Sequence, residues 1–187
     1  MVAIDEESNV RVDLTGKPHF RFQDLAAYKK ISGQHVKEMD FCWLRDGKLF
    51  MLEVKAYSDE MEQAKEENVT AEQFVKYLVD KTAPKVWDSL LMFSACWLPT
   101  NQGTQFRDDL PKAFHTPICP ICVVIVLDVP AWLKRQHFAT LRTRFRDVLR
   151  GKMTLFDSEN IIICTPGQLG DFSERLPEVS AMIDDNG

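Results

Sequence analysis

Two apolar, aromatic-rich segments in the first third of the chain are separated by a short polar turn. Residues 39–44 and 49–54 each form a strand-length apolar run, and Asp46-Gly47 lies between them. An Asp-Gly pair between two such runs is typical of the two-residue type I′ turn that joins antiparallel strands. The pattern therefore predicts a β-hairpin in this region.

Helical patterns occur before and after this hairpin. Residues 20–31 and the basic segment 131–150 carry apolar positions at helical spacing. Thr70 to Gln73 match a capping box, which predicts a helix from there to about residue 82. Proline is favoured in the first turn of a helix and not in its interior, so we expect Pro84 to begin a second helix that ends near residue 95.

The remaining segments predict strands and one long connection. Residues 11–14 predict a short edge strand, whereas residues 121–129 and 160–165 are apolar enough for buried strands. Residues 99–118 contain three prolines and predict an irregular connection. Strands 121–129 and 160–165 should be parallel, because a helix joins them.

A hairpin followed by helices, then strand, helix and strand, is typical of an α/β protein. We expect a single three-layer domain over residues 1–187, with a mixed central β-sheet and flanking helices. Its core should span about residues 20–165, and residues 183–187 are expected to fray. A chain of 187 residues with 45% hydrophobic and 27% charged residues suits one globular domain and excludes disorder and coiled coil as its main character.

The cysteine content and the amino-terminal sequence indicate the cellular compartment in which the protein is expected. The five cysteines are an odd number, and the first ten residues are acidic, with no apolar stretch that could act as a secretory signal. We therefore expect free thiols and a cytoplasmic location. No apolar run approaches the ~20 residues that a membrane span needs.

Charge is unevenly distributed along a chain whose net charge is −5. Residues 134–152 hold seven basic residues and one aspartate, and Arg142, Arg146 and Arg150 recur at the four-residue spacing of one helix face. This stripe could contact a nucleic-acid phosphate backbone, or it could be a solvated outer face. Residues 59–72 hold six acidic residues and one lysine, which favours a solvated face or a protein partner.

The hairpin register brings ionisable residues together. A two-residue turn places Asp40 opposite Glu53 and Glu38 opposite Lys55, all on one face of the sheet. Opposed carboxylates repel at a Cβ separation of about 4.5–5.5 Å unless a cation lies between them. Carboxylates with a nearby backbone carbonyl suit Mg²⁺, and Lys55 could hold a water or a phosphoryl oxygen beside it. The alternative is a cross-strand charge ladder at a solvated strand end.

Met39-Asp40, followed after twelve residues by Glu53-Val54-Lys55, resembles the motif of the PD-(D/E)XK nuclease superfamily, which has the restriction-endonuclease-like fold. The resemblance implies that Asp40, Glu53 and the Val54 carbonyl bind Mg²⁺ and that Lys55 positions the attacking water. The family's order of core elements is expected over residues 20–128. The acidic residue that the first helix often supplies would be Asp24 or, in its place, Glu38.

Gln73 and Tyr77 form a QxxxY pattern that resembles RecB-like members of that superfamily, where such residues line the site. Their alternative roles are a helix cap and a half-buried core position.

The resemblance implies a metal-dependent nuclease that uses Mg²⁺, with Mn²⁺ as a substitute. DNA is expected as its nucleic acid ahead of RNA, although the sequence does not decide between them. A catalytically silent domain of the same fold that binds nucleic acid or protein is the alternative, and an unrelated α/β interaction domain is a third. A homo-oligomer, or a protein partner bound through residues 59–72, is compatible with each of these.

Overall fold

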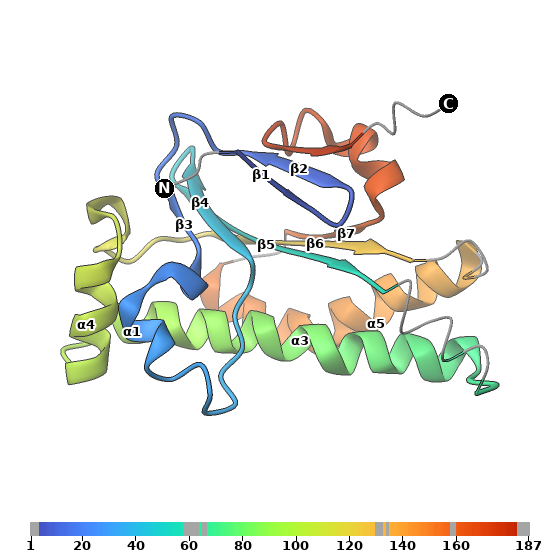
Figure 1. Cartoon of the computed structure of the whole chain (residues 1–187), viewed down its shortest axis with the longest axis horizontal. Coiled ribbons are helices and arrows are strands. Elements are labelled where there is room, and N and C mark those ends of the chain that lie inside the picture. The colour runs from blue at the N-terminus through green and yellow to red at the C-terminus, as the bar shows by residue number, and fades with distance from the viewer. Residues whose placement is uncertain are drawn as a thin grey trace.

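A five-stranded mixed sheet forms the centre of the computed structural model, which describes residues 4–57, 64, 67–129, 133, 135–157 and 160–182 (Figure 1). The strands are adjacent in the order in which the chain forms them. They are β3 (His19–Phe20), β4 (Phe41–Arg45), β5 (Lys48–Ala56), β6 (Ile121–Asp128) and β7 (Ile161–Cys164).

The predicted hairpin is confirmed, with the predicted register. Strands β4 and β5 are antiparallel, and their pairs run from Arg45 with Lys48 to Phe41 with Leu52. Asp46 and Gly47 have φ angles of +50° and +71°, as a type I′ turn requires. Strands β5, β6 and β7 are mutually parallel, so the predicted parallel connection is also confirmed.

A second, antiparallel sheet joins the two ends of the described chain. Its order is β1 (Ile4–Glu7), β2 (Val10–Asp13) and β8 (Val179–Ala181). The strand predicted at residues 11–14 is therefore the central strand of this sheet and not an edge strand. Neither β1 nor β8 was predicted, because each is only three or four residues long and lacks a distinctive apolar pattern.

Helix α3 (Ala71–Cys96) begins at the predicted Thr70 capping box and runs without interruption through Pro84. The predicted break at Pro84 is wrong. Proline removes one backbone donor from a helix, at a typical cost of about 3 kcal/mol. Buried side chains on both sides of Pro84, among them Leu78, Val79, Val86 and Leu90, hold the two halves of the helix against the core.

Two other predictions are corrected. The helix expected at residues 20–31 is reduced to a 3-10 turn (Phe22–Asp24) and α1 (Ala26–Lys29), because Phe20 pairs with Cys42 in the sheet. The connection expected at residues 99–118 contains α4 (Asn101–Asp109), which Thr100 caps by accepting a hydrogen bond from the Gly103 N–H. Short 3-10 turns follow at Lys112–Phe114, Thr154–Phe156 and Pro166–Phe172.

The sheet faces two different layers. Helices α1, α3, α4 and α5 (Arg135–Met153) bury one face in a large core, as Figure 1 shows below the sheet. The small sheet and the 3-10 turn at Pro166–Phe172 cover the other face. The mixed α/β class is therefore confirmed, but the described helices flank only one face of the central sheet.

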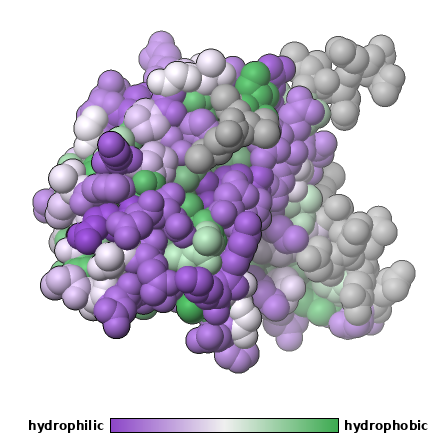
Figure 2. All heavy atoms as spheres, turned by 60° about the vertical axis from the view of Figure 1, so that its left-hand side comes forward, coloured by the Kyte–Doolittle hydropathy of each residue, from purple (hydrophilic) through white to green (hydrophobic). Residues whose placement is uncertain are grey.

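The surface is mainly polar on the side that carries α1 and α4. Figure 2 shows that hydrophilic side chains dominate this view, with small apolar patches between them. Among the described residues, none of the helices is both long and apolar enough to span a membrane. Residues 183–187, which were expected to fray, and half of the acidic segment 59–72 lie outside the described residues.

Candidate active site

Asp40 and Glu53 lie on the helix-covered face of the sheet, at the open end of the hairpin. Glu53 is in β5 and its side chain is 1% exposed, whereas Asp40 directly precedes β4 and its side chain is 14% exposed. The Val54 N–H donates a 2.8 Å hydrogen bond to Asp40 Oδ2, which fixes that carboxylate against β5. The two side chains are therefore brought to one place, as the register predicts.

Lys85 of α3 reaches these two carboxylates from the opposite layer. Its Nζ lies 2.5 Å from Glu53 Oε1 and 3.7 Å from Asp40 Oδ1. The continuous helix through Pro84 places the lysine there, one residue after the proline. Lys85 was not among the predicted site residues. The available signal was helical spacing, because Tyr77, Lys81 and Lys85 recur at four-residue intervals on one helix face.

One ammonium group cannot neutralise two carboxylates. Burial raises the pKa of Glu53 well above its ordinary value, and the negative charge of Asp40 raises it further. Burial also raises the pKa of Asp40, although the charge of Lys85 and the Val54 hydrogen bond oppose the shift. Burial acts to lower the pKa of Lys85, but Glu53 and Asp40 outweigh it and the pKa is raised. With both carboxylates ionised, the cluster has a deficit of positive charge, which a proton on Glu53 or a bound cation would offset.

A second basic residue supports the Asp40 backbone. Arg21 donates through Nε to the Asp40 carbonyl at 3.2 Å and forms ion pairs with Asp5 and Glu7 of β1. Burial raises the pKa of the Glu7 carboxyl, with a further contribution from the charge of Asp40. The amino-terminal hairpin thus adds negative charge beside the candidate site, which sequence reasoning missed.

Lys55 projects from the exposed end of β5, two residues beyond Glu53. Its Nζ lies 5.8 Å from the centre of the Tyr57 ring, and no ion pair between Lys55 and the two carboxylates is formed in the described part of the chain. The Tyr57 hydroxyl is 3.2 Å from Thr82 Oγ1, so this tyrosine joins the strand end to α3. Lys55 therefore lies at the exposed end of β5, which with Tyr57 we call the mouth of the site, whereas Lys85 contacts both carboxylates directly.

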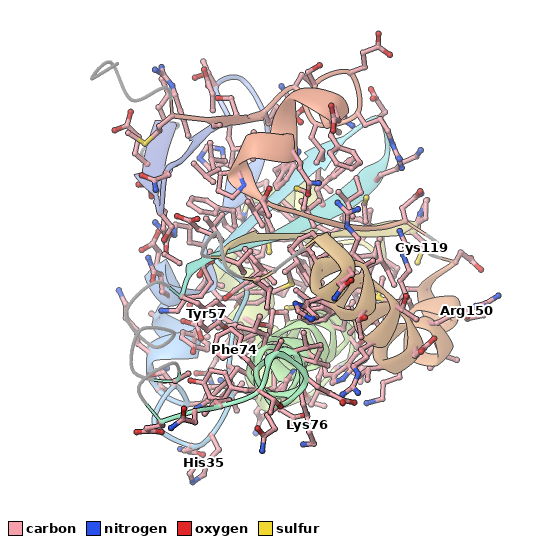
Figure 3. The ribbon with its side chains drawn as sticks, turned by 90° about the vertical axis from the view of Figure 1, so that its right-hand side faces the viewer. His35, Tyr57, Phe74, Lys76, Cys119 and Arg150 are labelled. Atoms are coloured by element: carbon pink, nitrogen blue, oxygen red, sulfur yellow. The ribbon has the colours of Figure 1, made fainter. Side chains whose placement is uncertain are left out.

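Gln73 and Tyr77 occupy different environments. The side chain of Gln73 accepts a 2.8 Å hydrogen bond from the Thr70 N–H, so it serves the helix cap. Tyr77 is 36% exposed and its ring centre lies 6.3 Å from that of Tyr57. Figure 3 shows Tyr57 and Phe74 close together below the sheet. Tyr77 therefore borders the mouth beside Tyr57, and Gln73 lies at the start of the helix.

The two candidates for an additional acidic residue are also separated. Glu38 accepts a hydrogen bond from the Tyr28 hydroxyl and is close enough to contribute to the raised pKa of Lys85. Asp24 is exposed in the 3-10 turn that precedes α1, and no described contact links it to the carboxylate pair. Glu38 is therefore the acidic residue at the edge of the site.

The predicted arginine stripe is divided. Arg142 donates through Nε to the Ile163 carbonyl at 2.9 Å, and it lines a hollow together with Arg146. Arg150 lies outside this hollow, and Figure 3 shows it on the outer side of α5, away from Tyr57. The three side chains do not form one uniform exposed face.

The carboxylate pair fits a divalent cation of the Mg²⁺ type. Glu53 Oε2 is buried and has no hydrogen-bond partner among the described residues, so an acceptor oxygen at the site is unsatisfied. Magnesium is usually held by one or two carboxylates and completes its shell with water and substrate oxygens. The described residues contain no group of three or more histidine, cysteine or acidic side chains suited to a metal. A cation bound at this pair would have Asp40 and Glu53 as its side-chain ligands.

Replacing Glu53 with glutamine should change how stability depends on pH. Because folding raises the pKa of Glu53 above 4.5, the folded chain retains a proton that the unfolded chain releases. The free energy of unfolding should fall as pH rises from about 4.5 through the folded-state pKa, by at most ~1.4 kcal/mol per pH unit for this group. Glu53→Gln should show a shallower fall. Denaturant titrations between about pH 5 and 8 measure both slopes, and equal slopes would contradict the shift.

Comparisons with protein-family models, curated proteins and solved structures gave no match to this chain. The case for a function therefore rests on the geometry of the site.

Proposed function

We propose that this chain is a metal-dependent nuclease that hydrolyses phosphodiester bonds and belongs to the PD-(D/E)XK superfamily. The observation that carries the proposal is the buried Asp40–Glu53 pair at the open end of a hairpin, in which Glu53 Oε2 has no hydrogen-bond partner among the described residues. An ion pair with a purely structural role would match Lys85 with one carboxylate and would not need a second. The second buried carboxylate is costly unless it takes up a proton or binds a cation, because an unpaired buried charge is strongly unfavourable.

The order of elements supports the same proposal. The antiparallel strands β3, β4 and β5 are followed by α3 and then by β6, which pairs with β5 in parallel. From β4 onward this order agrees with the core that the resemblance implies. The first helix is reduced to the short elements at residues 22–29, which follow β3 instead of preceding it. The restriction-endonuclease-like fold is part of the proposal.

The chain's own residues would act as follows. Asp40 and Glu53 would hold Mg²⁺ or Mn²⁺ with the Val54 carbonyl, while the Val54 N–H orients Asp40. When bound, the ion would polarise a water and stabilise negative charge on the phosphate. Lys55, at the mouth, would orient that water and interact with the scissile phosphate. Lys85 would partly neutralise the carboxylates whenever no divalent ion is present.

The presence of Lys85 also favours the second candidate, a catalytically silent domain of the same fold. Its ammonium group lies within 4 Å of both carboxylates and supplies a cation without any metal. A domain that only binds nucleic acid or protein would need such a lysine to bury the pair. The two functions differ in whether a divalent ion can bind Asp40 and Glu53 in competition with the Lys85 ammonium group.

Cleavage assays test the proposal directly. The wild-type chain and Glu53→Gln should be incubated with single- and double-stranded DNA and RNA in Mg²⁺ or Mn²⁺, with EDTA controls. We expect wild type to cleave DNA more readily than RNA, and Glu53→Gln to lose activity by a factor of about 10² or more, because it lacks an anionic ligand. Activity that survives both EDTA and Glu53→Gln would come from a contaminant. Wild type that binds but cleaves no substrate would favour the silent domain.

A further inference from the structure

A hollow with three arginines lies beside β7, the edge strand of the central sheet. Its volume is about 280 Å³. Arg142 and Arg146 of α5 and Arg175 of the carboxy-terminal segment supply its basic side chains, and residues 160–163 and Phe172 complete it. Three guanidinium groups around one small hollow repel one another unless an anion lies between them.

The main chain of β7 shapes this hollow. Asn160 directs its carbonyl inward, where it accepts a 3.0 Å hydrogen bond from the Val123 N–H of β6. Peptide groups alternate in direction along a strand, so those of Ile161 and Ile163 face the outer edge. Arg142 donates to the Ile163 carbonyl at 2.9 Å and to Gln168 Oε1 at 2.8 Å, which holds its guanidinium group in place. The hollow is therefore a built feature, with one arginine already fixed.

A second hollow of about 180 Å³ adjoins the first and extends its positive charge. The two share Asn160, Ile162 and Arg175, and the second adds Arg45 and Lys48 from the hairpin. Cys122 also lines the second hollow. Burial raises the pKa of the Cys122 thiol to about 11, and the charges of Arg175, Arg45 and Lys48 all act in the opposite direction. Three cations from different segments therefore converge on this point.

Most of this charge is not compensated by the described residues. Neither hollow has a carboxylate among its described lining residues. The positive charge of Arg45 is compensated, because this arginine forms an ion pair with the buried Glu178 at 2.7 Å. Arg175 has a 3.4 Å hydrogen bond to the neutral Asn160 Oδ1, and neither Arg146 nor Lys48 forms an ion pair with a described residue. Among the described residues, Arg146 and Lys48 therefore have charged groups without an ion-pair partner, and an external anion could bind to them.

The basic hollows are separate from the carboxylate pair. Lys48 begins β5 and Glu53 lies five residues further along, which is about 17 Å at the usual rise per residue. Both hollows border Ile162, and the second also borders Phe50. These two side chains belong to the core on the face away from the helices, whereas Glu53 points toward α3. One phosphate cannot reach both places.

We propose that the two adjoining hollows form a phosphate-binding site that is independent of the candidate active site. Arginine forks match the geometry of phosphate oxygens, and several arginines around one concave surface are typical of phosphate recognition. The phosphate can belong to a small phosphorylated compound or to a nucleic-acid backbone. Because the site uses no metal, the proposal does not depend on nuclease activity.

Calorimetric titration of the full chain with inorganic pyrophosphate in EDTA buffer tests this site. We expect Arg146→Gln and Arg175→Gln each to weaken binding by at least about tenfold, because each removes a charged donor. Arg150→Gln is the matched control, since this arginine is exposed on the same helix outside both hollows, and it should change the affinity by less than about twofold. Unchanged melting temperatures would show that the variants fold.

The source of the phosphate is then separated by competition. A short single-stranded oligonucleotide that displaces pyrophosphate, and loses affinity in the same two variants, would identify a nucleic-acid backbone as the ligand. Pyrophosphate binding without such competition would indicate a small phosphorylated compound, and both outcomes support the site. The proposal is overturned if pyrophosphate does not bind, if both variants bind as wild type does, or if Arg150→Gln weakens binding as much as they do.

Discussion

Replacing Lys85 with methionine should lower the free energy of unfolding by about 3 kcal/mol, the lower end of the range for breaking a buried ion pair. Methionine keeps the length of the side chain but leaves Asp40 and Glu53 facing each other without a cation. The lower end applies because the Lys85 side chain remains 28% exposed and water can partly screen the pair. Thermal unfolding in EDTA should show a melting temperature about 6–12 °C below that of wild type.

Lys81→Met is the control for this substitution. Lys81 is exposed one turn earlier on the same helix face, where its Nζ lies 5.4 Å from the centre of the Tyr77 ring. Its replacement should change stability by no more than about 0.5 kcal/mol. Mn²⁺ should raise the melting temperature of Lys85→Met more than that of wild type, because the ion no longer competes with the ammonium group. Equal stability of Lys85→Met and wild type would contradict the role given to this lysine.

Lys55→Ala should lose most cleavage while it keeps the fold and the metal. Lysine is a donor without acceptor atoms, so Asp40 and Glu53 can still bind the ion after its removal. Its ammonium group would orient water and offset charge that grows only in the transition state. The loss of one such preorganised donor typically costs a factor of about 10²–10³ in rate. Single-turnover cleavage and Mn²⁺ titration on the same preparation would measure the two effects separately.

Two other variants make the Lys55 result interpretable. Lys76→Ala removes an exposed lysine of α3 that pairs with Asp80, and it should cleave as wild type does. Asp40→Ala should lose both metal binding and cleavage, because it removes a ligand. A Lys55→Ala chain that is as active as wild type would exclude this lysine from the mechanism and leave Lys85 as the lysine to test.

The parts of the site that depend on local sequence could be predicted. The Asp46-Gly47 turn determines the register of β4 and β5, and the register determines that Asp40 and Glu53 share a face. Such a turn involves only neighbouring residues, so no information about the rest of the chain is needed. The Thr70 capping box was predictable for the same reason.

The parts of the fold and of the site that depend on tertiary packing could not be predicted from the sequence. Pro84 has an intrinsic preference against a helix interior, and that preference suggested two helices where packing stabilises one. The predicted break removed the helical periodicity that connects Tyr77 to Lys85, so the lysine closest to the carboxylates was missed. The segment at residues 20–31 was misassigned because Phe20 pairs in the sheet, which a local apolar pattern does not reveal.

Long-range contacts also changed the interpretation of the charged residues. Arg21 connects the amino-terminal β1 to the Asp40 backbone. These segments share no sequence motif that would indicate the contact. Arg142 and Arg146 are one helical turn from each other, as predicted, but they face β7 and Arg175. Helical spacing shows which side chains share a face, whereas the partner of that face comes only from the fold.

Calorimetric titration of Mn²⁺ into the wild-type chain and into Asp40→Asn tests the central claim most directly. Asparagine has nearly the same shape as aspartate and can still accept the Val54 hydrogen bond, so the variant should fold. We predict that wild type binds one Mn²⁺ with an affinity that rises with pH, because both carboxylates must lose their protons, and that Asp40→Asn binds at least about tenfold more weakly. Wild type that binds no Mn²⁺, or Asp40→Asn that binds it as tightly as wild type, would contradict the account.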